Sequence, residues 1–192
     1  MPSYAPALFL KKFLRHGVKI ASVAPSSPWL CRGMANAVPF ERCNIIVELG
    51  AGTGPMTNEL RRRMQPGTRL IAVESDDDFC AHLRTHYPDV DIVQGDATRL
   101  AEHLDARGIT VVDAIVNCLP TPTLTADGQA RLFSDIARRL APGGVYVQLT
   151  EFPLVFLPYY RKRFNDVAFH FVARNIPPSG YYVCRDPKET IA

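Results

Sequence analysis

The sequence lacks three features that would assign it to a specialised class of protein. No uncharged apolar run in the 192 residues approaches the roughly 18–20 residues that a membrane-spanning helix requires. The N-terminus shows no leader pattern, because Lys11 and Lys12 follow a short apolar stretch instead of preceding a long one. The five cysteines form no Cys-x-x-Cys pair, so neither a disulfide framework nor a metal site is indicated. We therefore expect a protein of the reducing cytoplasm.

The net charge is also small, but the positive charge is unevenly distributed. The formal net charge is +3, and residues 1–42 hold six Lys or Arg residues against one acidic residue, whereas the remaining chain holds 16 against 18. Apolar residues at helical spacing predict an amphipathic helix over residues 7–19, namely Leu10, Phe13, Leu14 and Val18. Basic residues occupy its other face, and such a helix can lie on an anionic membrane surface.

From residue 44 onward the sequence alternates between short apolar segments and helical segments. Strands are predicted at 44–49, 69–74, 90–94, 111–117 and 145–150, with helices near 56–65, 76–86, 98–106 and 128–140. This alternation predicts a doubly wound, Rossmann-like α/β fold with five parallel strands. Two further apolar segments, 167–173 and 180–184, flank a Pro-Pro-Ser-Gly turn. They predict an antiparallel edge hairpin, for seven strands in all.

Local signals refine this outline. Ser27 followed by Pro28 predicts the start of a second N-terminal helix. Gly143-Gly144 predicts the C-cap and turn that end the helix near 128–140, and a further helix is predicted around 154–164. We divide the chain into N-terminal amphipathic helices, residues 1–42, that cap the active site, and an α/β unit, residues 43–192.

The first predicted strand runs into a glycine-rich loop, Glu48-Leu49-Gly50-Ala51-Gly52-Thr53-Gly54-Pro55. Glycines at alternate positions let the backbone turn tightly and approach a ligand closely. The loop departs from the G-x-G-x-x-G dinucleotide fingerprint, since Pro55 occupies the sixth position. A carboxylate at Glu48 suits a ligand with a cationic amine. The loop is also compatible with a tight turn that binds nothing.

Polar residues follow the next three predicted strands as well. Glu74, 24 residues after Gly50, can accept two hydrogen bonds from a ribose diol, and Asp96 can accept one from an adenine amino group. Both also fit a role as helix N-caps. Asn117 begins the segment Asn-Cys-Leu-Pro after the fourth strand, where an oxygen atom would face the reacting group. Because parallel strands share one carboxyl edge, we expect these residues to form one site.

Together these motifs resemble those of class I S-adenosylmethionine-dependent methyltransferases. The resemblance implies S-adenosylmethionine as the cofactor, with the glycine loop under its methionine part, an acid holding the ribose and an Asp holding the adenine. On this sequence the implied cofactor-binding residues are Glu48, Gly50, Ala51, Gly52, Gly54, Glu74, Ser75, Asp96, Ala97 and Asn117.

A narrower resemblance, to bacterial phospholipid N-methyltransferases, extends from about residue 8 to residue 185. It is carried by the glycine loop together with Val23-Ala24-Pro25-Ser26-Ser27, Phe79, Tyr87-Pro88, Gly95-Asp96-Ala97 and Arg174-Asn175-Ile176-Pro177-Pro178. It implies N-methylation of an amine headgroup such as phosphatidylethanolamine at the cytoplasmic membrane surface. Two segments depart from the family pattern: Asn117-Cys118-Leu119-Pro120 replaces Ser-Gly-Leu-Pro, and Gln148-Leu149-Thr150-Glu151 replaces Gln-Phe-Thr-Tyr.

The departing segments supply the candidate catalytic residues. The Asn117 side chain or the backbone carbonyls of Cys118 and Leu119 can accept an N–H and aim the nitrogen lone pair. Glu151 can take the proton or bind a cationic product. Aromatic residues after the fifth strand either bind that cation or pack a helix on the sheet: Phe152, Phe156, Tyr159 and Tyr160.

Two alternatives stay open. The phospholipid enzymes are similar to the rRNA adenine dimethylases, but here Cys118 stands directly before Leu-Pro and Thr121 replaces the stacking aromatic residue, which argues against nucleic acid. A non-catalytic S-adenosylmethionine-binding protein is the other alternative. We expect a cytoplasmic protein at the inner membrane surface, and the sequence does not predict its oligomeric state.

Overall fold

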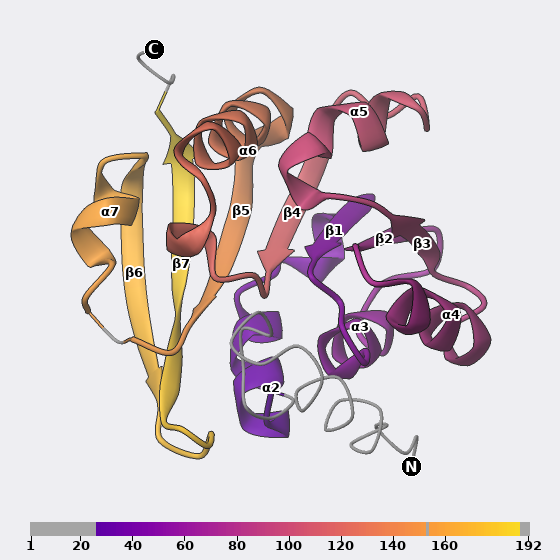
Figure 1. Ribbon diagram of the computed structural model, residues 1–192, viewed down its shortest axis with the longest axis horizontal. Helices are drawn as coiled ribbons and strands as arrows, with labels where there is room; N and C mark the ends of the chain where they lie inside the picture. Colours follow the sequence, from indigo (N-terminus) through magenta and orange to yellow (C-terminus); the bar gives the residue numbers. More distant parts are fainter. Residues whose placement is uncertain (1–25, 153, 189–192) are drawn as a thin grey trace.

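The computed structural model describes residues 26–152 and 154–188, in which seven strands form one mixed sheet (Figure 1). The spatial order is β3-β2-β1-β4-β5-β7-β6. The strands are β1 (Ile45–Leu49), β2 (Arg69–Glu74), β3 (Asp91–Gln94), β4 (Val112–Asn117), β5 (Leu140–Thr150), β6 (Phe164–Val172) and β7 (Ser179–Pro187). The first five run parallel, and β7 pairs antiparallel with both β5 and β6. The predicted parallel sheet with an edge hairpin is therefore confirmed.

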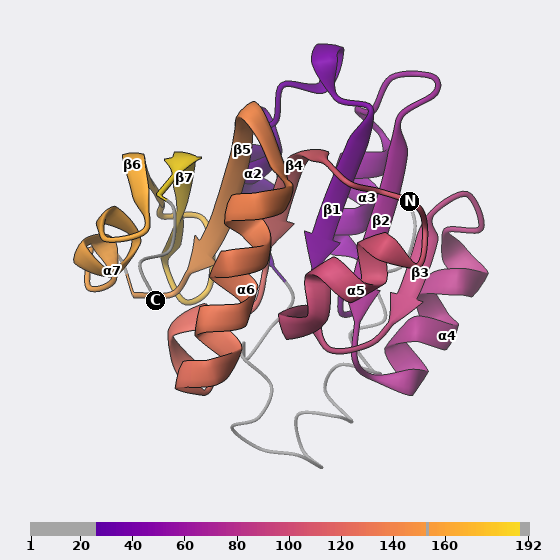
Figure 2. The same cartoon turned by 90° about the horizontal axis from the view of Figure 1, so that it is seen from above.

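Helices cover both faces of this sheet (Figure 2). They are α2 (Pro28–Asn36), α3 (Pro55–Arg61), α4 (Asp77–His86), α5 (Leu100–Asp105), α6 (Ala126–Arg139) and α7 (Leu157–Arg161), with short 3-10 turns η2 (Phe40–Arg42), η3 (Ala97–Arg99) and η4 (Thr121–Thr123). One buried cluster joins α2, α3 and α4 to one face, and a second joins α5, α6 and α7 to the other. Because both faces are covered, the parallel strands are apolar along most of their length.

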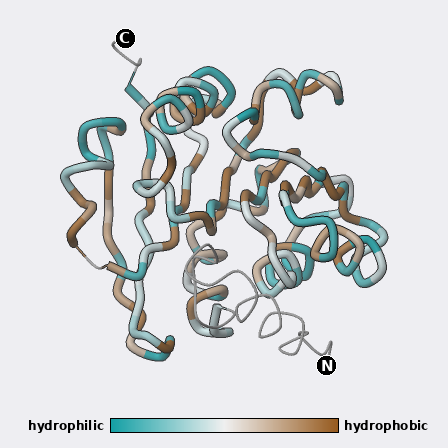
Figure 3. The backbone as a smooth tube through the Cα atoms, viewed as in Figure 1, coloured by the Kyte–Doolittle hydropathy of each residue, from teal (hydrophilic) through white to brown (hydrophobic). Residues whose placement is uncertain are grey.

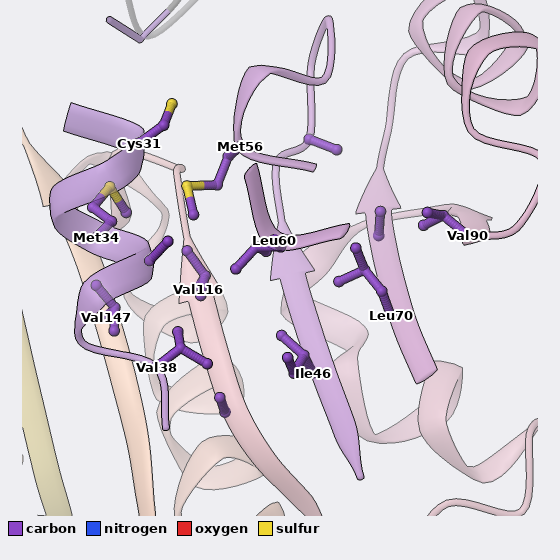
Figure 4. Packing of buried hydrophobic residues seen from close by; sticks show 14 of the residues in the cluster. Cys31, Met34, Val38, Ile46, Met56, Leu60, Leu70, Val90, Val116 and Val147 are labelled. Carbon is purple, nitrogen blue, oxygen red and sulfur yellow. The ribbon is translucent and has the colours of Figure 1, made fainter. Parts of the chain in front are cut away.

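Helix α2 begins as the sequence predicts, since Ser27 is its N-cap and the Ser27 Oγ accepts a hydrogen bond from the Leu30 N–H at 3.2 Å. Its buried face, with Met34, packs among side chains of the sheet such as Val116 and Val147 (Figure 4). Residues 28–36 therefore share a hydrophobic core with the α/β unit. The predicted helix over residues 7–19 lies outside the described residues.

Two predicted boundaries are wrong. Gly143-Gly144 does not cap α6: the helix ends at Arg139, Leu140 is already extended, and both glycines lie within β5. The reason is long-range pairing, because Leu140 is the register partner of Val112 on β4, with a register shift before the next pair. The helix predicted at 154–164 is shorter, since α7 covers only Leu157–Arg161 and the β6 strand starts at Phe164.

The carboxyl ends of the central strands lie at one edge of the sheet and are connected by backbone hydrogen bonds. Gly50 donates to the Val73 carbonyl, Cys118 donates to the Leu49 carbonyl, and Gly95 donates to the Glu74 carbonyl, at 2.8–2.9 Å. The turn between β6 and β7 lies at this same edge, because β7 runs antiparallel to β5 (Figure 1). Within the described ranges, none of the helices is long and apolar enough to cross a membrane.

Candidate active site

The glycine-rich loop joins β1 to α3 and contains three glycines with left-handed backbone. Gly50, Gly52 and Gly54 have φ values of 76°, 54° and 89°, a region in which residues with a Cβ are strained. A Cβ on Gly50 would lie 2.5 Å from the Leu119 Cδ2 atom, so the loop of β4 packs directly on this glycine. A Cβ on Gly52 would meet no atom within 4 Å. The loop is thus tightly packed at its start and open at its centre.

Glu48, immediately before this loop, is fully buried and only half satisfied. Its Oε2 accepts a hydrogen bond from the Thr57 hydroxyl at 2.6 Å, whereas its Oε1 has no partner among the described residues. Burial raises the pKa of Glu48 to about 8, the Thr57 bond lowers it, and the charge of Glu74 raises it further. A buried carboxylate oxygen without a partner is costly unless a ligand satisfies it. The arrangement therefore fits a cationic group.

Glu74 connects the glycine loop to the loop that follows β2. Its Oε2 accepts from the Gly52 N–H at 2.8 Å, and its Oε1 accepts from the N–H groups of Ser75 and Asp76 at 2.8 and 2.9 Å. The Glu74 side chain is 9% exposed, and the adjacent Ser75 is exposed. Glu74 is thus a positioned acceptor rather than the N-cap of α4, a role that the structure gives to Asp76.

Asp96 follows β3 and remains accessible. Its Oδ1 accepts from the Thr98 N–H at 2.8 Å, which makes Asp96 the N-cap of η3, while the next residue, Ala97, is buried. The sequence predicts a cap for a helix over residues 98–106, but Asp96 caps only the 3-10 turn η3, and α5 begins after Arg99 without a side-chain cap. Because Asp96 itself is exposed, its second carboxylate oxygen stays open to a ligand beside the other two loops.

Asn117, at the end of β4, belongs to a buried hydrogen-bond network. Its Nδ2 donates to the Thr121 and Tyr146 hydroxyls at 2.9 and 2.8 Å, and its Oδ1 accepts from the Leu119 N–H at 2.8 Å. Gln148 accepts from both hydroxyls through Oε1 and donates to the Leu119 carbonyl through Nε2. Satisfied buried networks of this kind rigidify the backbone that they hold, here residues 117–121.

Comparisons with known proteins agree with this geometry. A family model described as a methyltransferase domain matches residues 46–144. The chain is also 44% identical over 186 residues to the ornithine lipid N-methyltransferase of Singulisphaera acidiphila, covering 95% of this chain and 97% of that protein. The chain belongs to the class I S-adenosylmethionine-dependent methyltransferases.

Solved structures share the fold of this methyltransferase. A TehB-like SAM-dependent methyltransferase from Corynebacterium glutamicum is 18% identical, with a TM-score of 0.59 and coverage of 95% of this chain and 98% of the other. The O-methyltransferase from Bacillus cereus in complex with SAH is 15% identical, with a TM-score of 0.63 and coverage of 91% and 88%. At these identities the likeness shows the architecture alone.

The cofactor of the methyltransferase is S-adenosylmethionine, and the site fits it. The unpartnered Oε1 of Glu48 suits the ammonium group of the methionine part, and the space beside Gly52 leaves the loop open to it. Glu74 and Asp96 present carboxylate oxygens on the two neighbouring strand ends, where a ribose and an adenine are expected. The individual contacts of the ten predicted cofactor-binding residues remain predictions.

One predicted catalytic role has to be corrected. The Asn117 side chain is fully buried, and each of its polar atoms has a partner inside the methyltransferase. It therefore positions the loop after β4 instead of accepting an N–H from a substrate. The reason is that its amide donates to the Thr121 and Tyr146 hydroxyls, and both hydroxyls in turn donate to Gln148.

The other candidate residues are placed as follows. Cys118 is half-buried, and burial together with the nearby charge of Glu48 raises the pKa of its thiol well above the ordinary value, so this thiol is not a proton acceptor. Glu151 is half-buried directly after β5, and its role remains a prediction. Asp113 lies at the opposite end of β4, where its Oδ2 accepts from the Asn44 and Ile45 N–H groups.

The aromatic residues after β5 divide into two groups. Tyr160 is buried against Tyr182, with ring centroids 4.8 Å apart. The Tyr159 ring already carries the Arg163 guanidinium, 3.6 Å from its centroid. These two tyrosines therefore pack a helix on the sheet, whereas Phe152 is 60% exposed.

Sequence reasoning missed Thr57 and Tyr146, and it names Gln148 in a family motif without giving it a role. Thr57 orients Glu48, and the other two hold the loop after β4. Each is an ordinary helix or strand residue by pattern. The sequence signal for Gln148 is its place at the end of a strand, but its partners are about 30 residues away along the chain.

We expect the variant Tyr146→Phe to test the network. Removing the hydroxyl takes one partner from the Asn117 amide and one from Gln148, which should lower the free energy of unfolding by about 1–3 kcal/mol. Denaturant unfolding measures this loss. Affinity for S-adenosylhomocysteine should change less than twofold, and a large loss of affinity would contradict the purely positioning role of the network.

Proposed function

We propose that this methyltransferase methylates the amine nitrogen of an amine-bearing lipid, with an ornithine-type headgroup favoured over phosphatidylethanolamine. The observation that carries the proposal is the 44% identity to an ornithine lipid N-methyltransferase along 95% of this chain. The departures from the phospholipid enzymes, at residues 117–120 and 148–151, lie at the carboxyl ends of β4 and β5, and Leu119 of the first segment packs on Gly50 of the glycine loop. A different amine headgroup is consistent with changes at those positions.

The bound cofactor supplies an electrophilic methyl group on a sulfonium. The chain's task is then to hold a neutral amine in line with that methyl group and to exclude water. The Leu119 carbonyl accepts from Gln148, and the Pro120 carbonyl accepts from the Thr123 N–H. Among the described residues no hydrogen bond reaches the Cys118 carbonyl, so this oxygen is the acceptor that we assign to a substrate N–H. The buried network below keeps it in position.

The proton of the substrate ammonium needs an acceptor, since an ammonium has no lone pair. We assign this role to Glu151, whose half-buried carboxyl group directly follows β5, the neighbour of β4 in the sheet. Asp113 is excluded by its position at the other end of β4. Glu151→Gln should therefore lower kcat by a larger factor than it changes KM.

The proposed site of action is the cytoplasmic surface of a membrane. The basic amphipathic segment over residues 7–19 supports this location from the sequence, because a helix with such faces can lie in an anionic interface. A lipid substrate also requires that the active-site edge of the sheet approach the bilayer.

The deciding experiment is transfer of labelled methyl groups to an ornithine lipid, to phosphatidylethanolamine and to an adenine-containing RNA, each at equal concentration. The proposal expects the ornithine lipid to accept methyl groups at the highest kcat/KM. Transfer confined to phosphatidylethanolamine would reject the headgroup assignment, and transfer confined to RNA would reject a lipid substrate. Glu48→Gln serves as a variant with an altered site, and Val111→Ser as a surface variant far from it.

Glu74→Ala should weaken cofactor binding. The carboxylate holds the glycine loop through the Gly52 N–H and is assigned to the ribose, so we expect at least a tenfold loss of affinity for S-adenosylhomocysteine by calorimetry, about 1.4 kcal/mol. Stability should also fall, because three N–H groups lose their acceptor. The control is Glu102→Ala, which removes an exposed carboxylate paired with Arg99. Equal affinity in the two variants would reject the ribose assignment.

A further inference from the structure

The large exposed apolar side chains of this protein are concentrated at one edge. Seven such residues are exposed in the described part of the chain, and six of them belong to three segments at the carboxyl end of β5. We call these six the apolar rim: Trp29, Phe152, Leu154, Val155, Phe171 and Ile176. The seventh, Val111, precedes β4 at the opposite edge of the sheet.

Contacts connect the three segments. Trp29, at the start of α2, lies under the guanidinium of Arg174, 5.6 Å from its ring centroid, and the Ser27 N–H donates to the Asn175 side chain at 2.9 Å. The start of α2 and the turn between β6 and β7 therefore lie side by side, as Figure 1 also shows. Ile176, in this turn, is 85% exposed.

The third segment joins the same edge through the strand register. Phe171 on β6 pairs with Gly180 on β7, and Gly180 pairs with Thr150, the last residue of β5. Phe152 is held beside that residue, since its N–H donates to the Thr150 hydroxyl at 3.2 Å. In Figure 3 the chain between β5 and α7 and the tip of the β6–β7 hairpin both carry hydrophobic colouring. Exposed apolar side chains from the start of α2, from the chain after β5 and from the β6–β7 hairpin thus lie at the edge that holds the active site.

We propose that the apolar rim inserts into the interface of an anionic lipid bilayer and places the active-site edge against it; this rests on the proposed function. Exposed apolar side chains this concentrated mark an interaction surface. Tryptophan at the interface level and an arginine beside it, here Trp29 and Arg174, are typical of lipid contact. Arg174 supplies the positive charge that complements anionic headgroups.

Continuity with the N-terminal segment supports a membrane as the occupant. The basic segment predicted to be amphipathic, residues 7–19, enters the described structure at Ser26, two residues before α2 begins. That entry point lies at the rim, because Ser27 bonds to the hairpin turn. The described chain therefore begins beside the apolar rim, a short distance in sequence after the basic segment.

The test uses the one tryptophan of the chain as its probe. Full-length protein is titrated with vesicles of phosphatidylcholine and phosphatidylglycerol, with and without bromine on the acyl chains, and tryptophan emission is recorded. The rim predicts a blue shift on vesicle binding and quenching by the brominated lipids. Vesicle binding by sedimentation without quenching would overturn the proposal.

Two other occupants give different results. A blue shift that rises with protein concentration in the absence of vesicles means that a second copy covers the rim, and this overturns the proposal. Emission that is already blue-shifted in dilute protein, and that brominated vesicles do not quench, means that another segment of the chain covers Trp29. That result overturns the proposal as well.

Variants separate the rim from the rest of the surface. Val155→Asp and Ile176→Asp should each lower vesicle affinity about tenfold, because burial of one aliphatic side chain is lost and a negative charge is added. Val111→Asp makes the same chemical change at the opposite edge and should leave vesicle affinity within about twofold. Equal effects at all three positions would overturn the assignment.

Activity distinguishes the rim from the proposed function. Rim variants should lose methyl transfer to a lipid in vesicles and keep it toward a short-chain, water-soluble aminolipid. If no amine lipid accepts a methyl group in either form, the proposed function fails. Quenching by brominated lipids still tests whether the apolar rim inserts into the bilayer. Undiminished transfer in vesicles by Val155→Asp and Ile176→Asp would overturn the rim while leaving the function in place.

Discussion

Gly50→Ala is expected to weaken cofactor binding at least tenfold and to destabilise the fold. Position 50 has a φ of 76°, which strains any residue with a Cβ, and the added Cβ would lie 2.5 Å from Leu119 Cδ2. Leu119 has to move, but its N–H and carbonyl are held by Asn117 and Gln148. We expect a loss of about 2–4 kcal/mol in the free energy of unfolding, with at least a tenfold loss of S-adenosylhomocysteine affinity.

A second glycine separates backbone strain from crowding. Gly67 has a similar φ of 91°, yet a Cβ there would meet no atom within 4 Å. Gly67→Ala should therefore show only the strain, about 1–2 kcal/mol, with cofactor affinity unchanged. The double variant Gly50→Ala with Leu119→Ala restores space and should recover part of the lost affinity. Equal losses in Gly50→Ala and Gly67→Ala, measured by denaturant unfolding and calorimetry, would refute the packing argument.

A predicted element matches the structure when the residues that determine it lie close together in the sequence, and it fails when they lie far apart. Ser27 as the N-cap of α2 depends on residues three positions apart, and the strand–helix alternation depends on windows of similar size. The start of β5 at Leu140 depends on pairing with Val112, 28 residues away. No local pattern contains that information, so the sequence around Gly143-Gly144 predicts a helix cap where the structure has a strand.

The same distinction holds within the active site. Glycine spacing and strand-end carboxylates mark Glu48, Glu74 and Asp96, because strand ends in a parallel sheet share one edge. What each side chain does there depends on neighbours from other strands. Asn117 looks like a substrate-facing amide in sequence, whereas in the folded protein its Nδ2 donates to Tyr146, 29 residues away, and the Tyr146 hydroxyl donates to Gln148.

Glu48 should make both stability and cofactor affinity depend on pH. Its pKa rises from 4.5 in the unfolded chain to about 8 in the folded protein, so the folded state binds more protons between these values. Stability from this residue is therefore greatest below about pH 4.5 and declines as pH rises toward 8. Glu48→Gln cannot ionise and should flatten that decline, so the variant gains stability relative to wild type as pH rises from 5 to 8 in thermal unfolding.

Cofactor binding should show the opposite dependence. The ammonium group assigned to Glu48 favours the ionised carboxylate, so binding below pH 8 releases a proton, and affinity rises with pH by at most about tenfold per unit. Calorimetry of S-adenosylhomocysteine in two buffers with different ionisation enthalpies measures the released proton. Glu48→Gln should bind more weakly and release none, and Thr57→Val, which removes the hydroxyl that stabilises the ionised form, should raise the pH at which the release ends. Proton release unchanged by Glu48→Gln would place the titrating group elsewhere and remove the buried carboxylate from the ammonium site.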